Sequence, residues 1–325
     1  MAIARSQFNI TPFVHISQPN RSNNTVPLTR ETAMPYLQVV CCKLTPLQTS
    51  LYKRLIAQME KIAAQSNQTK DVLSYLQMIQ KLCNHPTILT MSDTMSKERT
   101  GMTKEELSLL GVPVYAGSNG ANVTDIMPAI SGKMDVLHRL MDTMRQEKDP
   151  KNRERIVVVS ISTQTLDLVE KMCAKEKWPV MRLDGKIAVK KRQAMVNEFN
   201  NMNNPNAFCF LLSSKAGGCG INLIGANRLV LFDSDWNPAT DKQAAARCWR
   251  DGQKRKCYTY RFLSAGTMEE KVYQRQLSKE GLASVVEDKD QVNELGSHDL
   301  KRLFTLRENT PSDTHDKVSF VVVNS

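Results

Sequence analysis

Glycines and arginines gather in the stretch Leu211–Gln253, which holds the residue types best suited to phosphate chemistry. Gly217, Gly218 and Gly220 follow a strand-like apolar run, Ala207–Leu212. Because glycine has no side chain, its backbone N–H groups can approach a chain of phosphates closely. The spacing therefore predicts a phosphate-binding loop directly after a strand, although such glycines alone are weak support.

A polar group follows the loop in the same stretch and consists of Gln243, Arg247 and Arg250. Spacings of four and three predict that the three side chains share one face of a helix after the turn Asp233–Pro238. Two guanidiniums beside a glycine loop suit the charge that spreads over a phosphoryl group during its transfer. The alternative is a solvated basic helix face on which an arginine pairs with Asp251.

The combination AGGCGINL, DSDWNP and QAAARCWRDGQ resembles motifs V and VI of the Swi/Snf branch of superfamily 2 helicases. Within that branch it is most similar to the recombination-repair (Rad-fifty-four-like) subgroup of DNA translocases, and the similarity runs from about Tyr36 to Asp316. The resemblance implies three catalytic residues. Arg250 would be an arginine finger that reaches the γ-phosphate of ATP, Arg247 would contact the same phosphate, and Gln243 would orient it.

The resemblance also implies a nucleotide-binding set and a DNA-binding set. Asn222 would contact the nucleotide ribose, beside Gly218, Gly220, Arg247 and Arg250. Small hydroxyls and cations would hold the DNA backbone without reading bases: Ser213, Ser214, Lys215, Lys190, Lys191 and Arg192. Lys186 and the run Lys254–Lys256 would add salt-dependent attraction, unless these clusters are ordinary solvated faces.

Two motifs of a complete motor do not occur in this sequence, namely GxxxxGK[ST] and a DExx box after an apolar strand. Ser131-Gly132-Lys133-Met134 departs from the first pattern, and we interpret Ser131 as a helix N-cap. The resemblance implies that ATP and Mg²⁺ are bound mainly by a first lobe that is missing from this chain. We therefore expect this polypeptide alone not to hydrolyse ATP at a meaningful rate, although its family is one of ATP hydrolases.

Strands and helices alternate from Arg155 onward, which predicts an α/β fold with a parallel sheet covered by helices on both faces. The resemblance makes it a RecA-like second helicase lobe with flanking helical segments. The expected strands are Leu37–Leu44, before this region, and then Ile156–Ile161, Val180–Leu183, Ala207–Leu212, Arg228–Phe232 and Cys257–Leu263. Ligands in such sheets bind at the carboxyl ends of the strands, where the glycine loop and the turn Asp233–Pro238 fall.

Four regions are expected along the chain. Residues 1–35 read as a poorly ordered segment, 36–130 as a helical segment with a polar connector, 131–285 as the RecA-like lobe (motifs IV to VI) with a bracing helix, and 286–325 as a tail. Both ends depart from the family pattern, which we interpret as a truncated or mis-spliced reading of a longer gene.

Two single residues, His85 and Trp236, are of types that often have functional roles. We expect His85 instead to be packed or to cap a helix, and Trp236 to pack within its turn.

Composition indicates which class of partner the protein binds. The net charge of +11 favours a polyanionic partner, although a basic soluble enzyme would have the same charge. No apolar run approaches a membrane span, and the eight cysteines contain no CxxC pair, so we expect no membrane, no metal site and a reducing compartment. The resemblance implies double-stranded DNA, a strand-exchange recombinase filament and the first lobe as partners, in the nucleus. Two alternative functions remain possible for this chain: a non-catalytic DNA-binding or regulatory module, and a lobe of a chromatin remodeler.

Overall fold

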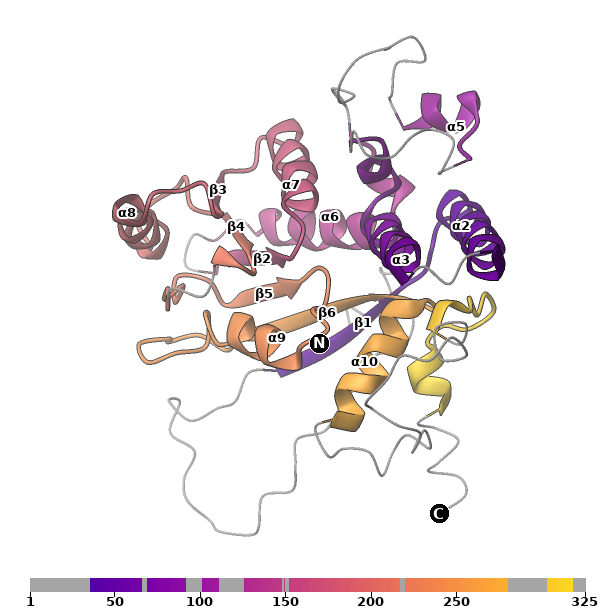
Figure 1. Cartoon of the computed structure of the whole chain (residues 1–325). Coiled ribbons are helices and arrows are strands. Elements are labelled where there is room, and N and C mark those ends of the chain that lie inside the picture. Colours follow the sequence, from indigo (N-terminus) through magenta and orange to yellow (C-terminus); the bar gives the residue numbers. More distant parts are fainter. Residues whose placement is uncertain are drawn as a thin grey trace. The chain divides into compact units, whose positions relative to one another are not determined.

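A computed structural model describes residues 36–65, 69–91, 101–110, 126–147, 149, 152–216, 220–279 and 303–317 (Figure 1). Expectations for residues 1–35, Gly217, Gly218 and most of the 286–325 tail lie outside these ranges. The chain divides into two compact units. The first contains Cys41–Leu137 with residues 263–317, and the second contains His138–Phe262 with residues 36–40. None of the described helices is both long enough and apolar enough to cross a membrane.

The sheet confirms the predicted α/β class. It has six parallel strands in the order β1-β6-β5-β2-β4-β3. The central strand β2 pairs Ile156 with Cys209 on one side and with Arg228 on the other, and all its residues are buried. Its run of Ile and Val is what a strand covered on both faces requires. The strands are β1 (Tyr36–Cys42), β2 (Ile156–Ser160), β3 (Val180–Leu183), β4 (Cys209–Ser213), β5 (Arg228–Leu231) and β6 (Tyr258–Ser264).

Three helices pack on the sheet in the second unit: α7 (Thr163–Lys175), α8 (Val189–Asn200) and α9 (Pro238–Ala245). The Ser162 hydroxyl caps α7, and the Asn237 side chain caps α9, which has proline in its first turn. One apolar core joins Val157 and Val159 of β2 to Phe199 of α8 and Ala244 of α9. Figure 1 shows α7 on one side of the sheet and α9 on the other, as a doubly covered parallel sheet predicts.

The first unit is mainly helical. Its core joins α2, α3 and α10 to Leu303 and Phe304, through buried residues such as Tyr52 and Ile79. Helix α2 begins at Pro46, and proline is favoured at the first position of a helix. The elements are α2 (Pro46–Gln65), α3 (Thr69–Asn84), η2 (Pro86–Thr90), α5 (Lys104–Leu109), η3 (Pro128–Ile130), α6 (Gly132–Arg145, which begins in this unit) and α10 (Met268–Lys279).

Ser131 and Lys133 have structural environments. The Ser131 hydroxyl accepts a hydrogen bond from Met134 N (3.3 Å), which confirms it as the cap of α6. The Lys133 side chain is fully buried, and its Nζ lies 2.5 Å from Oε1 of Glu269 and 3.2 Å from Oδ1 of Asn84. The Lys133 ammonium group is therefore part of a buried ion pair and is not presented to a phosphate. This environment agrees with the interpretation that Ser131–Met134 is not a phosphate-binding loop.

His85 caps a helix, as the sequence analysis expects. Its Nδ1 accepts a hydrogen bond from Thr87 N (3.2 Å) at the start of η2. The ring is buried, and burial lowers the pKa of His85 to about 4. A neutral imidazole is required for this capping role because a protonated Nδ1 could not accept the bond.

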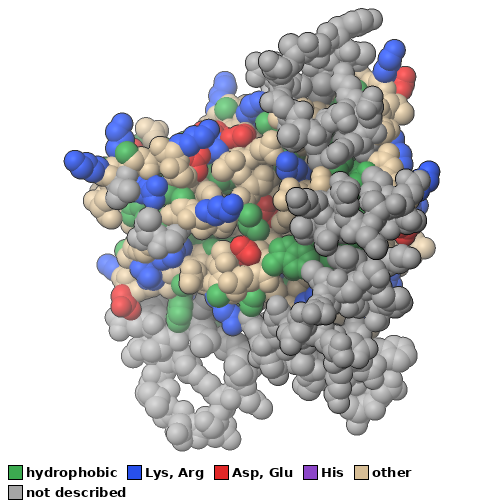
Figure 2. Space-filling view, viewed as in Figure 1, with side chains coloured by type: hydrophobic (Ala, Val, Ile, Leu, Met, Phe, Trp, Pro, Cys, Tyr) green, Lys and Arg blue, Asp and Glu red, His purple; other side chains and the backbone are tan. Residues whose placement is uncertain are grey.

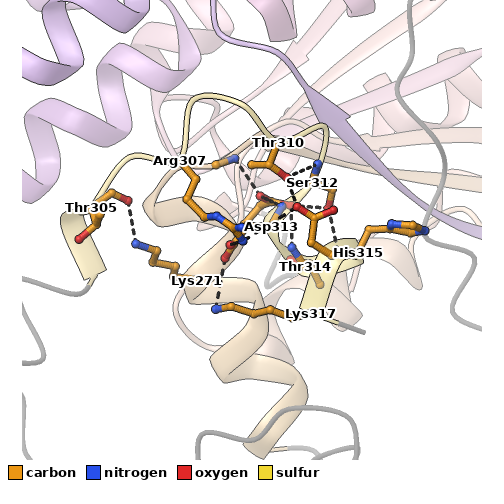
Figure 3. A network of polar contacts seen from close by, with 12 residues as sticks. Lys271, Thr305, Arg307, Thr310, Ser312, Asp313, Thr314, His315 and Lys317 are labelled. Atoms are coloured by element: carbon orange, nitrogen blue, oxygen red, sulfur yellow. Dashed lines mark hydrogen bonds and ion pairs between the residues drawn. The ribbon is translucent and has the colours of Figure 1, made fainter. Parts of the chain in front are cut away.

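A buried carboxylate, Glu270, fastens residues 312–314 to the start of α10. Its Oε1 accepts from Ser312 Oγ (2.6 Å), and its Oε2 accepts from Asp313 N (2.7 Å) and from Gly266 N (2.8 Å). Figure 3 shows Arg307 and Lys317 converging on Asp313 in the same network. At the start of α10 the Glu270 carboxylate accepts from Gly266 N, and the Thr267 hydroxyl accepts from Glu269 N.

Candidate nucleotide and DNA site

The carboxyl ends of β2, β4 and β5 meet at Asp233. Its Oδ2 accepts a hydrogen bond from Ser160 Oγ, and its Oδ1 accepts one from Ile161 N, both 2.8 Å long. Ser214 N donates to Ser160 O (3.0 Å) from the start of the glycine loop. The loop and the turn Asp233–Pro238 therefore lie at one edge of the sheet, as the parallel topology predicts.

The described part of the glycine loop contains a bend at Gly220, and the side chains that lead into the loop become progressively more exposed to solvent. Gly220 has a φ of +68°, which a residue with a Cβ rarely adopts. Ser213 closes β4 and is buried, Ser214 is half-buried, and Lys215 is exposed. Of these three predicted DNA contacts, Lys215 presents the most surface to a partner.

The helix predicted to carry the arginines is shorter than expected. Helix α9 ends at Ala245, and residues 246–252 form turns, so the shared face of Gln243, Arg247 and Arg250 does not exist. A tertiary bond accompanies this end: Leu223 N donates to Arg247 O (2.9 Å), the carbonyl to which residue 251 would donate in a continuing helix. Gln243 and Arg250 are exposed, whereas Arg247 is buried.

Arg250 nevertheless lies beside the glycine loop. Its Nη1 donates a hydrogen bond to Gly220 O (3.2 Å). Asn222 is half-buried, and its Oδ1 is buried without a hydrogen-bond partner within the described ranges. The fold thus brings Arg250, Gly220 and the Asn222 segment together, while Gln243 faces solvent on α9.

The turn before α9 is held by a carboxylate that the motifs did not single out. Asp241 Oδ1 accepts from Asp235 N (3.2 Å), and Asp241 Oδ2 lies 3.3 Å from Arg261 Nη2. Both charged side chains are buried. An arginine within the apolar strand Tyr258–Ser264 is the sequence signal for such a pair. Trp236 is 41% exposed, so the expectation that it packs to hold this turn stays a prediction.

Basic residues are displayed on and before α8. Figure 2 shows blue Lys and Arg side chains over the region of α8. Lys186, Lys190 and Lys191 are exposed, and the half-buried Arg192 donates from Nε to Ile187 O (2.9 Å). On the other basic run, Arg255 Nη1 donates to Arg153 O (2.5 Å). Each of the two clusters carries the charge that attracts a polyanion.

Two amide side chains, which the motif spacing did not predict, connect α8 and the turns after α9 to the segment that follows the glycine loop. Asn200, at the end of α8, bonds the backbone of Asn222 and Gly225, each at 2.8 Å. Gln253 bonds the backbone of Ile224 and Ala226. An Asn or Gln that serves backbone groups far away in sequence cannot be recognised from local pattern. Among the described residues, no group of three or more His, Cys, Asp or Glu is placed to hold a metal ion.

Comparisons with known proteins agree with this architecture. Residues 132–252 match the family described as Helicase conserved C-terminal domain. The chain is 47% identical over 285 residues to the DNA repair and recombination protein RAD54-like of Mus musculus, covering 86% of this chain and 36% of that protein. It is 47% identical over 296 residues to Protein CHROMATIN REMODELING 25 of Arabidopsis thaliana, covering 87% and 32%. The chain thus spans about a third of the length of these relatives.

Solved structures share the fold. The Sulfolobus solfataricus SWI2/SNF2 ATPase core in complex with dsDNA superposes with a TM-score of 0.59 at 24% identity, over 83% of this chain and 50% of that one. The C-terminal domain of that Sulfolobus ATPase superposes with a TM-score of 0.56 at 22% identity, over 83% and 98%. Residues 132–252 are thus a helicase conserved C-terminal domain, most of the chain is homologous to RAD54-like DNA repair and recombination proteins, and the fold is that of the RecA-like C-terminal lobe of SWI2/SNF2 ATPases.

Proposed function

We propose that this chain acts as the second lobe of a double-strand-DNA-dependent ATPase and translocase in homologous recombination and DNA repair. The observation that carries the proposal is the contact of Arg250 with Gly220, at the edge of the sheet where nucleotides bind in such folds. A guanidinium has five N–H donors, so a residue anchored by one of them is suited to stabilise charge on a transferring phosphoryl group.

In this function the roles are divided between two lobes. ATP and Mg²⁺ are held mainly by a first lobe, while this chain supplies Arg250 and Arg247 to the γ-phosphate and Asn222 to the ribose. Gln243 lies on the exposed face of α9, so a role in orienting phosphate requires the nucleotide to approach that face. Lys215 and the basic residues of α8 hold the DNA backbone. A nuclear strand-exchange recombinase filament is the partner on which the motor acts.

Mixing this chain with a separately expressed first lobe of the family tests the proposal. We expect no ATP hydrolysis from this chain alone, and DNA-stimulated phosphate release from the mixture. Release must disappear in Arg250→Ala. Duplex binding by this chain without restored hydrolysis would instead support a non-catalytic DNA-binding module.

The chromatin-remodeler alternative is favoured by one observation, the name of the Arabidopsis relative. It predicts that hydrolysis by the mixture is stimulated more by nucleosomes than by bare duplex DNA. The recombination function predicts the opposite order, and additional stimulation by a recombinase filament.

A further inference from the structure

The last residue of α8, Asn200, bridges that helix to the segment after the glycine loop. Its Nδ2 donates to Asn222 O (2.8 Å), and its Oδ1 accepts from Gly225 N (2.8 Å). Both ends of the side-chain amide are therefore used on one short stretch of backbone. A Cβ on Gly225 would lie 2.8 Å from both Asn200 Cα and Phe199 O, so the two backbones approach as closely as glycine allows.

Gln253 bonds the same segment through other carbonyl groups. Its Nε2 lies within hydrogen-bond distance of Ala226 O (2.8 Å), Ile224 O (3.1 Å) and Cys248 O (3.1 Å). Its Oε1 accepts from Arg255 N (2.9 Å). One side chain thereby joins the segment after the glycine loop to the arginine turn, which we define as residues 246–252.

The segment 222–226 is consequently bonded at every residue. Leu223 N donates to Arg247 O (2.9 Å), in addition to the bonds that Asn200 and Gln253 make to its neighbours. Arg155 holds the backbone directly after α8, because its Nη2 donates to Asn201 O (2.9 Å) and to Asn204 O (3.1 Å). Displacement of α8 therefore strains the segment 222–226, and displacement of that segment strains the arginine turn.

We propose that Asn200 and Gln253 are positioning residues that couple DNA contact at α8 to the placement of Arg250. This inference rests on the proposed function, in which α8 meets DNA and Arg250 meets nucleotide. The link runs from α8 through Asn200 to the segment 222–226, and through Gln253 to the arginine turn. Neither side chain needs to touch DNA or ATP.

Hydrogen exchange on this chain, with and without a short duplex DNA, tests the coupling. In the unaltered protein we expect DNA to slow amide exchange roughly fivefold at residues 222–226 and 247–250, the factor that one net hydrogen bond supplies. In Gln253→Ala the DNA-dependent slowing should remain at 222–226 and vanish at 247–250, with DNA affinity unchanged. In Asn200→Ala it should vanish at both. Gln146→Ala removes an exposed glutamine elsewhere in the second unit and should behave as the unaltered protein does.

The outcomes separate this inference from the function beneath it. Failure of the unaltered chain to bind duplex DNA would remove the proposed function itself. Binding with no response at 247–250, or an equal response in Gln253→Ala, would overturn the coupling alone. A purely structural role for Gln253 would change exchange equally with and without DNA, which also counts against the proposal. If Gln253→Ala fails to fold, Asn200→Asp tests the first step of the link, since it retains the acceptor for Gly225 N and loses the donor to Asn222 O. The DNA-dependent slowing should then weaken at both 222–226 and 247–250, and an undiminished response would overturn the coupling.

Discussion

The guanidinium of Arg250 is anchored to the carbonyl of Gly220, thirty positions earlier in the chain, by a 3.2 Å hydrogen bond. The exposed side chain is thereby directed to the bend of the glycine loop rather than left to sample solvent. A neutral carbonyl binds a guanidinium less strongly than a carboxylate or phosphate does. The contact can therefore orient Arg250 and still yield to a phosphate.

Replacing Arg250 by alanine should abolish DNA-stimulated ATP hydrolysis in the two-lobe mixture while leaving the fold intact. Loss of an arginine finger costs ~10³–10⁵ in turnover. The residue is exposed, so the free energy of unfolding should change by less than about 0.5 kcal/mol. Phosphate release and urea denaturation measure the two effects. Turnover within about tenfold of the unaltered mixture would exclude the finger role.

Gly225 should tolerate no side chain. In Gly225→Ala the new Cβ meets two backbone atoms of α8 at 2.8 Å, and overpacking of this kind costs about 1–3 kcal/mol. Gly185→Ala is the matched control, because nothing lies within 4 Å of a Cβ there. Urea denaturation should separate the two variants, and equal stability would show that α8 can move away from the segment 222–226.

Sequence alone could predict the sheet because each strand is encoded locally. Ile156–Val159 is apolar throughout, and Ser131 marks a helix start by its own capping chemistry. The arginine turn could not be predicted that way. Its local pattern favours a helix, and the bond from Leu223 N to Arg247 O that accompanies its end comes from a distant segment. The same holds for Asn200, whose role depends entirely on which backbone lies beside it.

The buried ion pair of Lys133 and Glu269 should be a major contributor to the stability of the first unit. In Lys133→Met the Glu269 carboxylate remains buried without its cation, which costs about 3–5 kcal/mol. The double variant Lys133→Met/Glu269→Gln should regain part of that loss, since a glutamine oxygen can still accept from Ser264 N. The control is Lys53→Met, which breaks an exposed pair with Glu308 and should cost about 0–1 kcal/mol.

Those costs are measured as shifts in the free energy of unfolding by urea denaturation. Comparable losses from Lys133→Met and Lys53→Met would show that the interior pair is compensated by repacking. A double variant as unstable as the single one would show that the cost comes from volume rather than from an isolated charge.

Glu270 should govern the attachment of residues 303–317. A glutamine at this position keeps one acceptor oxygen and turns an N–H group toward donors, among them Asp313 N and Gly266 N. Limited proteolysis between residues 305 and 311 should accelerate roughly tenfold in Glu270→Gln, as expected for one or two lost hydrogen bonds. The exposed Glu60→Gln, on α2, should leave cleavage at the original rate, and equal rates in all three proteins would contradict the anchoring role.

His85 should make stability fall as the pH drops from about 6.5 toward about 4, because its pKa is about 4 in the folded chain and 6.5 in the ordinary imidazole. Burial is the cause, since it disfavours the charged ring. In this window the unfolded chain binds a proton that the folded chain refuses, so protons favour unfolding. Stability from His85 is complete above pH 6.5 and lost on acidification, by about 2 kcal/mol between pH 7.5 and pH 5. Urea denaturation at the two pH values measures the change.

A control variant, His85→Asn, isolates the contribution of the imidazole from that of carboxylates, which titrate in part of this pH range. Asparagine can still accept a hydrogen bond from Thr87 N and carries no titratable proton. The variant should lose about 2 kcal/mol less than the unaltered protein over the same interval. An identical pH dependence in both would show that the ring takes up its proton without leaving the folded state, and the capping bond to Thr87 N would then be dispensable.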